Sequence, residues 1–208
     1  MPKTLDLTTW ARKSHFDFFR TFEEPFFGLC VEVDCTTAYR KAKELNTSFF
    51  LYYLYQSVKA VNETEPFRYR IVGDEVLIHD QVGASATINR ENGTFGFSYI
   101  PYAETFQEFE RGAQAEIERV RSTDGLVPSA AAENAIHYSS LPWVRFTSLS
   151  HARSFSHADS IPKISFGKMT EVDGKKLMPL SIHVHHALMD GYHVGQHIDL
   201  FQELLNQG

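Results

Sequence analysis

The sequence predicts an α+β fold built on a large mixed β-sheet. Three observations predict it: short apolar segments at strand spacing recur along the chain, turn-forming residues join several of them into hairpins, and a few longer segments have helical periodicity. Many strands joined by hairpins and mixed with few helices are typical of this class. The 208 residues contain no repeat, low-complexity tract or linker, so we expect a single domain, 1–208.

The helices are predicted where apolar residues recur every three or four positions. Thr8 or Thr9 can cap the first helix, and Glu23-Glu24-Pro25 follows its end. A later segment that starts at 46–48 is apolar nearly all round, so we expect that helix to be buried. The expected helices span residues 8–22, 36–45, 48–62, 105–121 and 193–206.

The strands are predicted from apolar runs that glycine-containing turns separate. These turns are Gly73-Asp74, Glu91-Asn92-Gly93 and Asp173-Gly174. One strand is broken at Leu141-Pro142 and is expected to resume over 143–149. The other expected strands are 26–34, 67–72, 75–79, 82–89, 94–100, 135–139, 163–170 and 176–184, with long connections at 125–134 and 151–161.

Composition excludes several classes of protein. The formal net charge of -6 argues against a surface for nucleic acid or an anionic membrane, because phosphates require clustered Lys and Arg. No apolar run approaches the length that spans a bilayer, and the N-terminus has no apolar signal region. We therefore expect a cytoplasmic protein.

The two cysteines are not expected to form a disulfide. Cys30 and Cys35 lie in one strand-like run, where alternation places them on opposite faces. Thiols on opposite faces of a strand cannot reach disulfide geometry. We expect two free thiols without a metal.

The block 185–191, His-His-Ala-Leu-Met-Asp-Gly, lies where the last expected strand ends and the chain turns into its final helix. An imidazole held there can accept a proton from a hydroxyl and return it, because its pKa lies near neutrality. Asp190 is placed to brace this turn. A lone histidine at a strand end is more often a packed core or turn residue. Two adjacent histidines, a spaced aspartate and an upstream serine favour catalysis.

Other kinds of site fit these residues less well. Five histidines between 183 and 197 are close enough in sequence to suggest metal ligands, but Ala187 stands where the carboxylate of a His-x-His metal hydrolase is expected. A serine hydrolase would require a Gly-x-Ser-x-Gly elbow, and nucleotide binding would require a glycine-rich loop. Neither pattern occurs, and we expect no metal.

The His-His-x-x-x-Asp-Gly block resembles the signature of the chloramphenicol acetyltransferase and dihydrolipoyl acyltransferase superfamily. Residues 139–147, Ser-Ser-Leu-Pro-Trp-Val-Arg-Phe-Thr, are similar to the segment that carries the family's active-site serine, and residues 10–20 to its N-terminal segment. Met178-Pro179-Leu180-Ser181 and His193-Val194-Gly195 also match. We expect the catalytic core to start at the beginning of the chain, which is about half as long as condensation enzymes. It therefore resembles the stand-alone chloramphenicol acetyltransferases most.

This resemblance implies a two-layer sandwich with helices on one face of the sheet, assembled as a homotrimer with active sites between subunits. It implies acetyl-CoA as the co-substrate, chloramphenicol or another small alcohol as the acceptor, and a role in antibiotic resistance. His186 is the implied general base and Ser139 the donor to the tetrahedral intermediate. Arg12 and Asp190 match a buried pair that fixes the turn behind the histidine. The alternatives are another hydroxyl acceptor, or a non-catalytic binding protein on the same fold.

The implied acceptor pocket combines matches with departures. His151 and Arg153 stand where these enzymes carry aliphatic side chains, and Phe97 stands where they carry a small residue. A cationic side chain and an added ring alter the volume and polarity of a pocket. Ser165 falls at a hydroxyl position that contacts the acceptor site. The remaining pocket matches are Phe18, Phe19, Phe27, Phe95 and Leu126.

Overall fold

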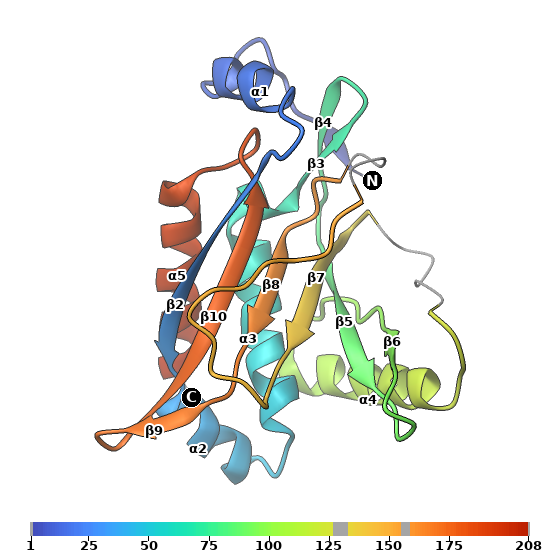
Figure 1. Cartoon of the computed structure of the whole chain (residues 1–208), viewed down its shortest axis with the longest axis vertical. Coiled ribbons are helices and arrows are strands. Elements are labelled where there is room, and N and C mark those ends of the chain that lie inside the picture. Colours follow the sequence, from blue (N-terminus) through green and yellow to red (C-terminus); the bar gives the residue numbers. More distant parts are fainter. Residues whose placement is uncertain (1, 127–132, 155–158, 208) are drawn as a thin grey trace.

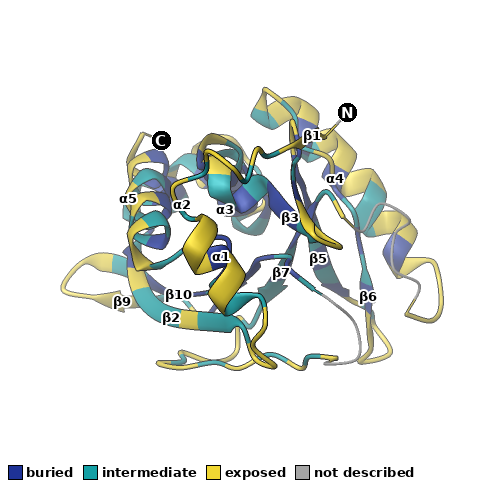
Figure 2. Ribbon diagram, turned by 90° about the horizontal axis from the view of Figure 1, so that it is seen from above, coloured by how far each residue is buried: buried dark blue, intermediate teal, exposed yellow. Residues whose placement is uncertain are grey.

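The computed structural model describes residues 2–126, 133–154 and 159–207. They form a sheet with helices gathered on one face, while the connection after β7 (Ala135–Ser140) crosses the other face (Figures 1 and 2). The α+β fold with a large mixed sheet is therefore confirmed. Its two-layer arrangement leaves one face of the sheet available for polar side chains.

The main sheet in the described part of the chain has seven strands. Its order is β2-β10-β8-β7-β5-β6, and β9 pairs with the first residues of β10. The three neighbours β5, β7 and β8 are parallel, whereas β10 is antiparallel to β2, β8 and β9, so the sheet is mixed. The bounds are β2 Phe26–Asp34, β5 Gly83–Asn89, β6 Phe95–Phe97, β8 Lys163–Phe166, β9 Thr170–Val172 and β10 Lys175–His185.

A smaller sheet packs beside the main one, with strand order β1-β4-β3. Arg20, just after α1, pairs with Asp74 in the turn between β3 and β4, which ties the first helix to this hairpin. The bounds are β1 Lys3–Thr4, β3 Tyr69–Val72 and β4 Glu75–Ile78.

The helices follow the predicted segments closely except for the first. Helix α3 has buried residues on all sides and packs against α5, as its apolar composition predicted. Thr105 caps α4 by accepting a hydrogen bond from the Glu108 N–H, and Asp190 caps α5. The bounds are α1 Lys13–Phe19, α2 Thr36–Glu44, α3 Phe49–Glu63, η1 Glu65–Arg68, α4 Phe106–Arg121 and α5 Gly191–Asn206.

The two faces of β10 differ in chemistry. Leu180, Ile182 and Val184 are buried in the hydrophobic core. The alternate residues Ser181 and His183 therefore point to the opposite, polar face. This alternation provides a row of polar side chains across the sheet, because neighbouring strands continue it in register.

The first helix was predicted too long. Thr8 and Thr9 donate hydroxyl hydrogen bonds to the Asp6 carboxylate, and the Thr8 N–H also binds it, so these residues form a turn rather than a helix cap. The helix begins at Lys13 and ends at Phe19.

The strand predicted over 143–149 is wrong. The Val144 N–H bonds back to the Leu141 carbonyl, closing a turn around Pro142, which cannot donate a ladder hydrogen bond. The strand predicted over 163–170 is divided into β8 and β9, with the Gly167 N–H bonded to the Pro179 carbonyl between them. Residues 127–132 and 155–158 of the two predicted connections lie outside the described part.

Cys30 and Cys35 are free thiols, as predicted. Among the described residues, no helix is long and apolar enough to cross a membrane.

Candidate active site

His186 follows the last residue of β10 and is held by its backbone and by its ring. Its N–H donates to the Pro25 carbonyl over 2.8 Å. The ring stacks on Phe19, with 3.9 Å between centroids and 18° between planes, and Phe27 packs on it at 4.6 Å. Two aromatic side chains from separate elements therefore fix the plane of the imidazole.

The hydrogen bond of the His186 ring determines its tautomer. Nδ1 lies 3.2 Å from the Met189 carbonyl oxygen, which can only accept, so Nδ1 carries the proton of the neutral ring. The lone pair of Nε2 is then available to accept a proton. This is the state that a general base needs.

Arg12 and Asp190 hold the turn behind this histidine. The Arg12 guanidinium pairs with the Asp190 carboxylate and donates to the His186 carbonyl over 3.2 Å. Asp190 also accepts the Tyr192 N–H and lies 2.8 Å from His193 Nδ1. Burial opposes ionisation of Asp190, but the hydrogen bonds from Arg12 and His193 outweigh it and lower its pKa to about 2. The carboxylate is therefore charged at neutral pH.

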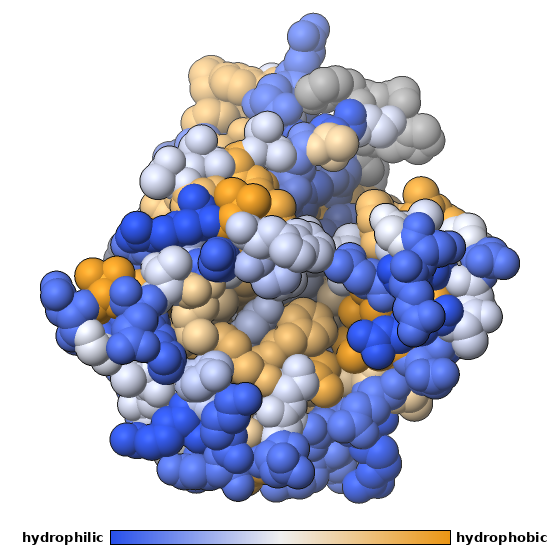
Figure 3. Space-filling view, turned by 60° about the horizontal axis from the view of Figure 1, so that its bottom comes forward, coloured by the Kyte–Doolittle hydropathy of each residue, from blue (hydrophilic) through white to orange (hydrophobic). Residues whose placement is uncertain are grey.

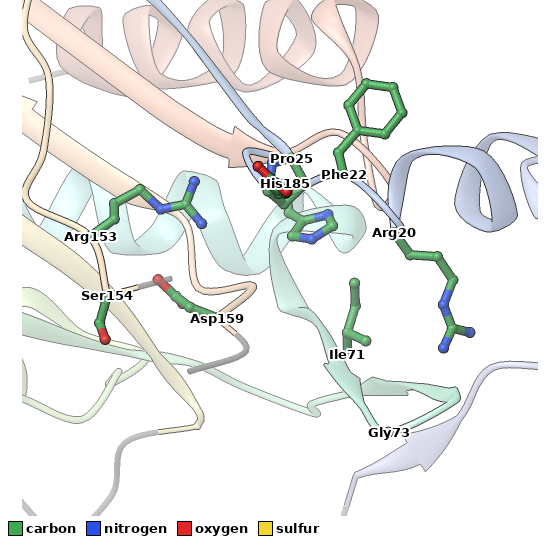
Figure 4. Close-up of a pocket in the computed structure, with 10 residues that line it drawn as sticks. Arg20, Phe22, Pro25, Ile71, Gly73, Arg153, Ser154, Asp159 and His185 are labelled. Carbon is green, nitrogen blue, oxygen red and sulfur yellow. The ribbon is translucent and has the colours of Figure 1, made fainter. Parts of the chain in front are cut away.

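His185, the other histidine of the pair, is buried and points elsewhere. Its Nδ1 accepts the Ala187 N–H, and burial followed by the charge of Arg153 lowers its pKa to about 4. The ring lines a cavity of about 340 Å³ together with Arg20, Pro25 and Ile71 (Figure 4).

Ser139 lies near the end of β7 and lines a different cavity of about 450 Å³. Phe95 and Phe97 line the same cavity, as does His151 from the connection after β7. Three sequence-predicted pocket residues are thus brought together with the predicted serine.

A third and larger cavity, of about 640 Å³, opens on the other side of the end of β7. Ser140 and Pro142 line it, with apolar side chains from the first turn of α3 and from β10. The side of the molecule that lies at the bottom of Figure 1 has a hollow with an apolar floor (Figure 3).

His186 and Ser139 do not meet within one chain. Ser139 is in register with Ser165 on β8, and Ser165 with Ser181 on β10. His186 lies five residues beyond Ser181, or roughly 17 Å farther along the sheet at about 3.4 Å per residue. A site that uses both side chains therefore requires two copies of the chain.

Chloramphenicol acetyltransferases resemble this chain over nearly its whole length. The family model described as chloramphenicol acetyltransferase matches residues 2–202. A chloramphenicol acetyltransferase of Bacillus pumilus is 32% identical over 94% of this chain and 90% of its own length. Chloramphenicol acetyltransferase 3 of Escherichia coli is 32% identical over 97% of this chain and 95% of its own length. A solved chloramphenicol acetyltransferase has a TM-score of 0.90, with 31% identity over 99% of this chain and all of that one.

The chain belongs to the chloramphenicol acetyltransferase family. The predictions of the family, of its fold and of an acyltransferase are therefore confirmed. The roles of individual side chains remain predictions, which the geometry above makes specific.

The other predicted pocket residues occupy three places. Phe18 packs edge-on against Phe19 and is largely exposed, so it extends the aromatic surface around His186. Ser165 is fully buried, and its hydroxyl has no partner among the described residues. Leu126 is exposed and lines none of the described cavities near Ser139.

Arg153 was expected beside His151, but the structure places it in the cavity of His185. Its guanidinium lies over the Phe26 ring, 3.8 Å from the centroid, and pairs with Glu24. This ring and this carboxylate, both near the start of β2, draw the side chain away from Ser139.

Among the residues of the Ser139 cavity that sequence reasoning missed are two basic side chains, His137 and Lys163. His137 precedes Ser139 by two positions on one strand, so the alternation of side chains could have revealed it. Lys163 is in register with His137 on the neighbouring strand, a relationship that no local pattern predicts. Among the described residues, no group of three His, Cys, Asp or Glu is placed to hold a metal ion.

Proposed function

We propose that the protein transfers the acetyl group of acetyl-CoA to a hydroxyl of chloramphenicol or a related small alcohol. Membership of the family supports the reaction type, and the relatives' names support the acceptor. The observation that carries the proposal is the His186 ring, whose Nδ1–H is committed to a carbonyl and whose Nε2 is left as a base.

In the proposed reaction, His186 Nε2 takes the hydroxyl proton while the alcohol oxygen attacks the thioester carbonyl. The new C–O bond gives a tetrahedral oxyanion, which accepts a hydrogen bond from the Ser139 hydroxyl. Collapse of this intermediate breaks the C–S bond. The departing sulfur takes the proton back from His186, so free coenzyme A and the acetyl ester are released.

We propose that each site forms between two copies in a homotrimer, with His186 from one copy and Ser139 from its neighbour. Their separation within one chain supports this arrangement. Exposed aromatic side chains lie near the histidine, namely Phe18, Phe22 and Tyr192, and association would cover such a surface. The whole chain, 1–208, would act as one domain in the cytoplasm, and acetylation would confer resistance to the antibiotic.

We place the acyl donor in the cavity of about 640 Å³ beside Ser140 and Pro142. It lies across β7 from the Ser139 cavity, since adjacent side chains of a strand point to opposite faces. Donor and acceptor would thus approach the end of one strand from its two sides. In this mechanism the chain's own side chains perform the proton transfers.

The test mixes the protein with acetyl-CoA and chloramphenicol and measures free thiol. Thiol release that the His186→Ala variant lacks is the expected result. Release with other alcohols but not with chloramphenicol would retain the mechanism and reject the substrate. Binding of acetyl-CoA without turnover of any alcohol would instead indicate a non-catalytic binding protein.

A further inference from the structure

The cavity beside Ser139 has a wall that the proposed reaction does not use. Two imidazoles, His137 from β7 and His151 from the connection after it, line this wall. The rings of Phe95 and Phe97 line the same cavity. A binding surface with both aromatic rings and convergent polar groups is characteristic of small-molecule sites.

His151 is held in a fixed orientation. Its ring meets the His183 ring edge to face, with 4.9 Å between centroids and 89° between planes. His183 is itself anchored, because its Nδ1 lies 3.3 Å from the Ser181 hydroxyl and its ring fills the space above Gly28. A side chain supported in this way can provide a directional hydrogen bond to a ligand.

Both imidazoles have hydrogen-bonding capacity to spare. Neither ring makes a hydrogen bond with the described residues, and of the two His151 nitrogens only Nε2 is fully buried. Burial, with neighbouring cationic or imidazole groups, lowers the pKa of each ring to about 4. Each is therefore neutral at pH 7 and carries one donor and one acceptor.

The charged group nearest to this wall is the ammonium group of Lys163, which is already paired. Lys163 Nζ lies 2.5 Å from an Asp159 oxygen and 3.2 Å from the Ile161 carbonyl, and it lies over the Phe26 ring at 4.4 Å. A carboxylate, a carbonyl and a ring face thus hold this ammonium group. The described lining of the cavity thus offers directional hydrogen bonds and no unpaired charge.

We propose that this cavity selects an acceptor alcohol that carries a second, uncharged hydrogen-bonding group, which His137 and His151 hold. The apolar body of the acceptor packs against Phe95 and Phe97. The inference rests on the proposed function, which places the reacting hydroxyl near Ser139. His137 and Ser139 are two strand positions apart, so the two polar groups of the acceptor lie roughly 6–7 Å from each other.

An ionised group in this position is disfavoured for a physical reason. It would lose its hydration on entering the cavity, and the described wall has no free charge to compensate for that loss. An apolar group of the same size would leave the imidazole nitrogens unpaired, which is also costly.

The test compares three benzyl alcohols of one shape: para-(hydroxymethyl)benzamide, para-methylbenzyl alcohol and para-(hydroxymethyl)benzoate. Each presents its para substituent about as far from the hydroxyl as the two strand positions require. Free thiol release gives kcat/KM for each compound. We expect the benzamide to exceed the methyl compound by at least about tenfold, the effect of one good hydrogen bond, and the benzoate to rank last.

Variants then connect this preference to the imidazoles. The double variant His137→Leu/His151→Leu should acetylate the benzamide and the methyl compound equally well, with the KM for acetyl-CoA unchanged. The variant His137→Asn/His151→Gln keeps hydrogen-bonding groups and should keep the preference. His79→Leu is the matched control, because His79 Nε2 is also buried without a partner among the described residues but lines none of the described cavities.

The outcomes separate the two proposals. Turnover without a preference for the benzamide, or a preference that survives in the double leucine variant, overturns the inference and leaves the proposed function standing. If none of the alcohols, chloramphenicol included, causes thiol release, both proposals are overturned. If only chloramphenicol is acetylated, the three alcohols are ranked as competitive inhibitors, and equal inhibition constants for benzamide and methyl compound overturn the inference.

Discussion

The guanidinium of Arg12 pairs with the carboxylate of Asp190, 178 residues away in the sequence. The same guanidinium donates to the His186 carbonyl, so the residue that precedes α1 holds the turn that carries the proposed base. Because Asp190 also caps α5, one carboxylate joins the beginning of the chain, the histidine turn and the last helix.

Substitution of either residue of this pair should lower kcat more strongly than it lowers the stability of the fold. Arg12→Lys keeps the charge but loses the fork that reaches both acceptors, and a displacement of about 1 Å can cost about 10²-fold in kcat. Asp190→Asn should have a similar effect. Since the pKa of Asp190 is lowered to about 2, the stability from this pair is present above pH 3.8 and is lost as the pH falls toward 2.

Steady-state kinetics and thermal unfolding of the same variants measure the two effects. Lys13→Ala is the control, since Lys13 is the next residue of the chain and its ammonium group pairs with the exposed Asp17. Wild-type kcat in Arg12→Lys would show that the pair has no part in positioning the histidine.

Ser139→Ala should lower kcat by roughly 10²–10³ with little change in the KM for either substrate, because the hydroxyl is proposed to bind the oxyanion and not the ground state. Ser57→Ala is a matched control. Ser57 is a fully buried hydroxyl on α3 that lies 3.0 Å from Tyr138 OH, so its removal should affect stability instead. A rise in KM at constant kcat would assign Ser139 to substrate binding.

Mixed assemblies should recover activity that neither parent has. Chains with His186→Ala and chains with Ser139→Ala, unfolded together and refolded at equal amounts, should regain activity in about a quarter of the sites of a cyclic trimer. The reason is that an intact pair then forms between a histidine and a serine from different copies. Failure of a refolded, trimeric mixture to recover activity, where refolded wild type is active, would contradict a shared site.

Gly28→Ala should disturb the wall that contains His151. A Cβ at this position would lie 2.3 Å from two atoms of the His183 ring, which must then move away from β2. We expect a several-fold rise in the KM for the acceptor with an unchanged KM for acetyl-CoA, measured by thiol release. Gly112→Ala on α4 is the control, since its added Cβ meets nothing within 4 Å. Equal effects of both substitutions would contradict the arrangement.

His197 should make the fold sensitive to acid. It is fully buried beside Phe67 and Phe201, and burial lowers its pKa from 6.5 to about 3. Its neutral form is the folded one, so its contribution is complete above pH 6.5 and is lost as the pH falls toward 3. His197→Leu should reduce the loss of unfolding free energy between pH 7 and pH 5 by about 2 kcal/mol, as measured by urea titration at both pH values. An unchanged difference would contradict this assignment.

Several features of this protein could be predicted from short stretches of sequence. The strand predicted over 26–34 has the bounds of β2, and the helix predicted from 105 to 121 is α4 with its cap. The place of His186 at the end of a strand was also predicted correctly. Each of these depends on periodicity and on turn chemistry within about fifteen residues, which determine local structure directly.

The first helix and the segment after Pro142 show where local patterns fail. The threonines before the first helix donate hydrogen bonds to Asp6 and do not cap the helix. The apolar residues after Pro142 resemble a strand, although the chain turns there. In both places a competing hydrogen bond or a missing N–H outweighs the apolar pattern.

The sequence by itself determined the family and the main elements, and it predicted the role of His186, because these are carried by contiguous motifs and local periodicity. Only the tertiary structure decided which polar side chains share a cavity. Lys163 lies beside His137 through the order of strands, whereas Arg153 leaves His151 for Phe26 and Glu24. The separation of His186 from Ser139 has the same origin. Local patterns indicate which face of an element is polar, and strand register together with long-range packing determines what that face meets.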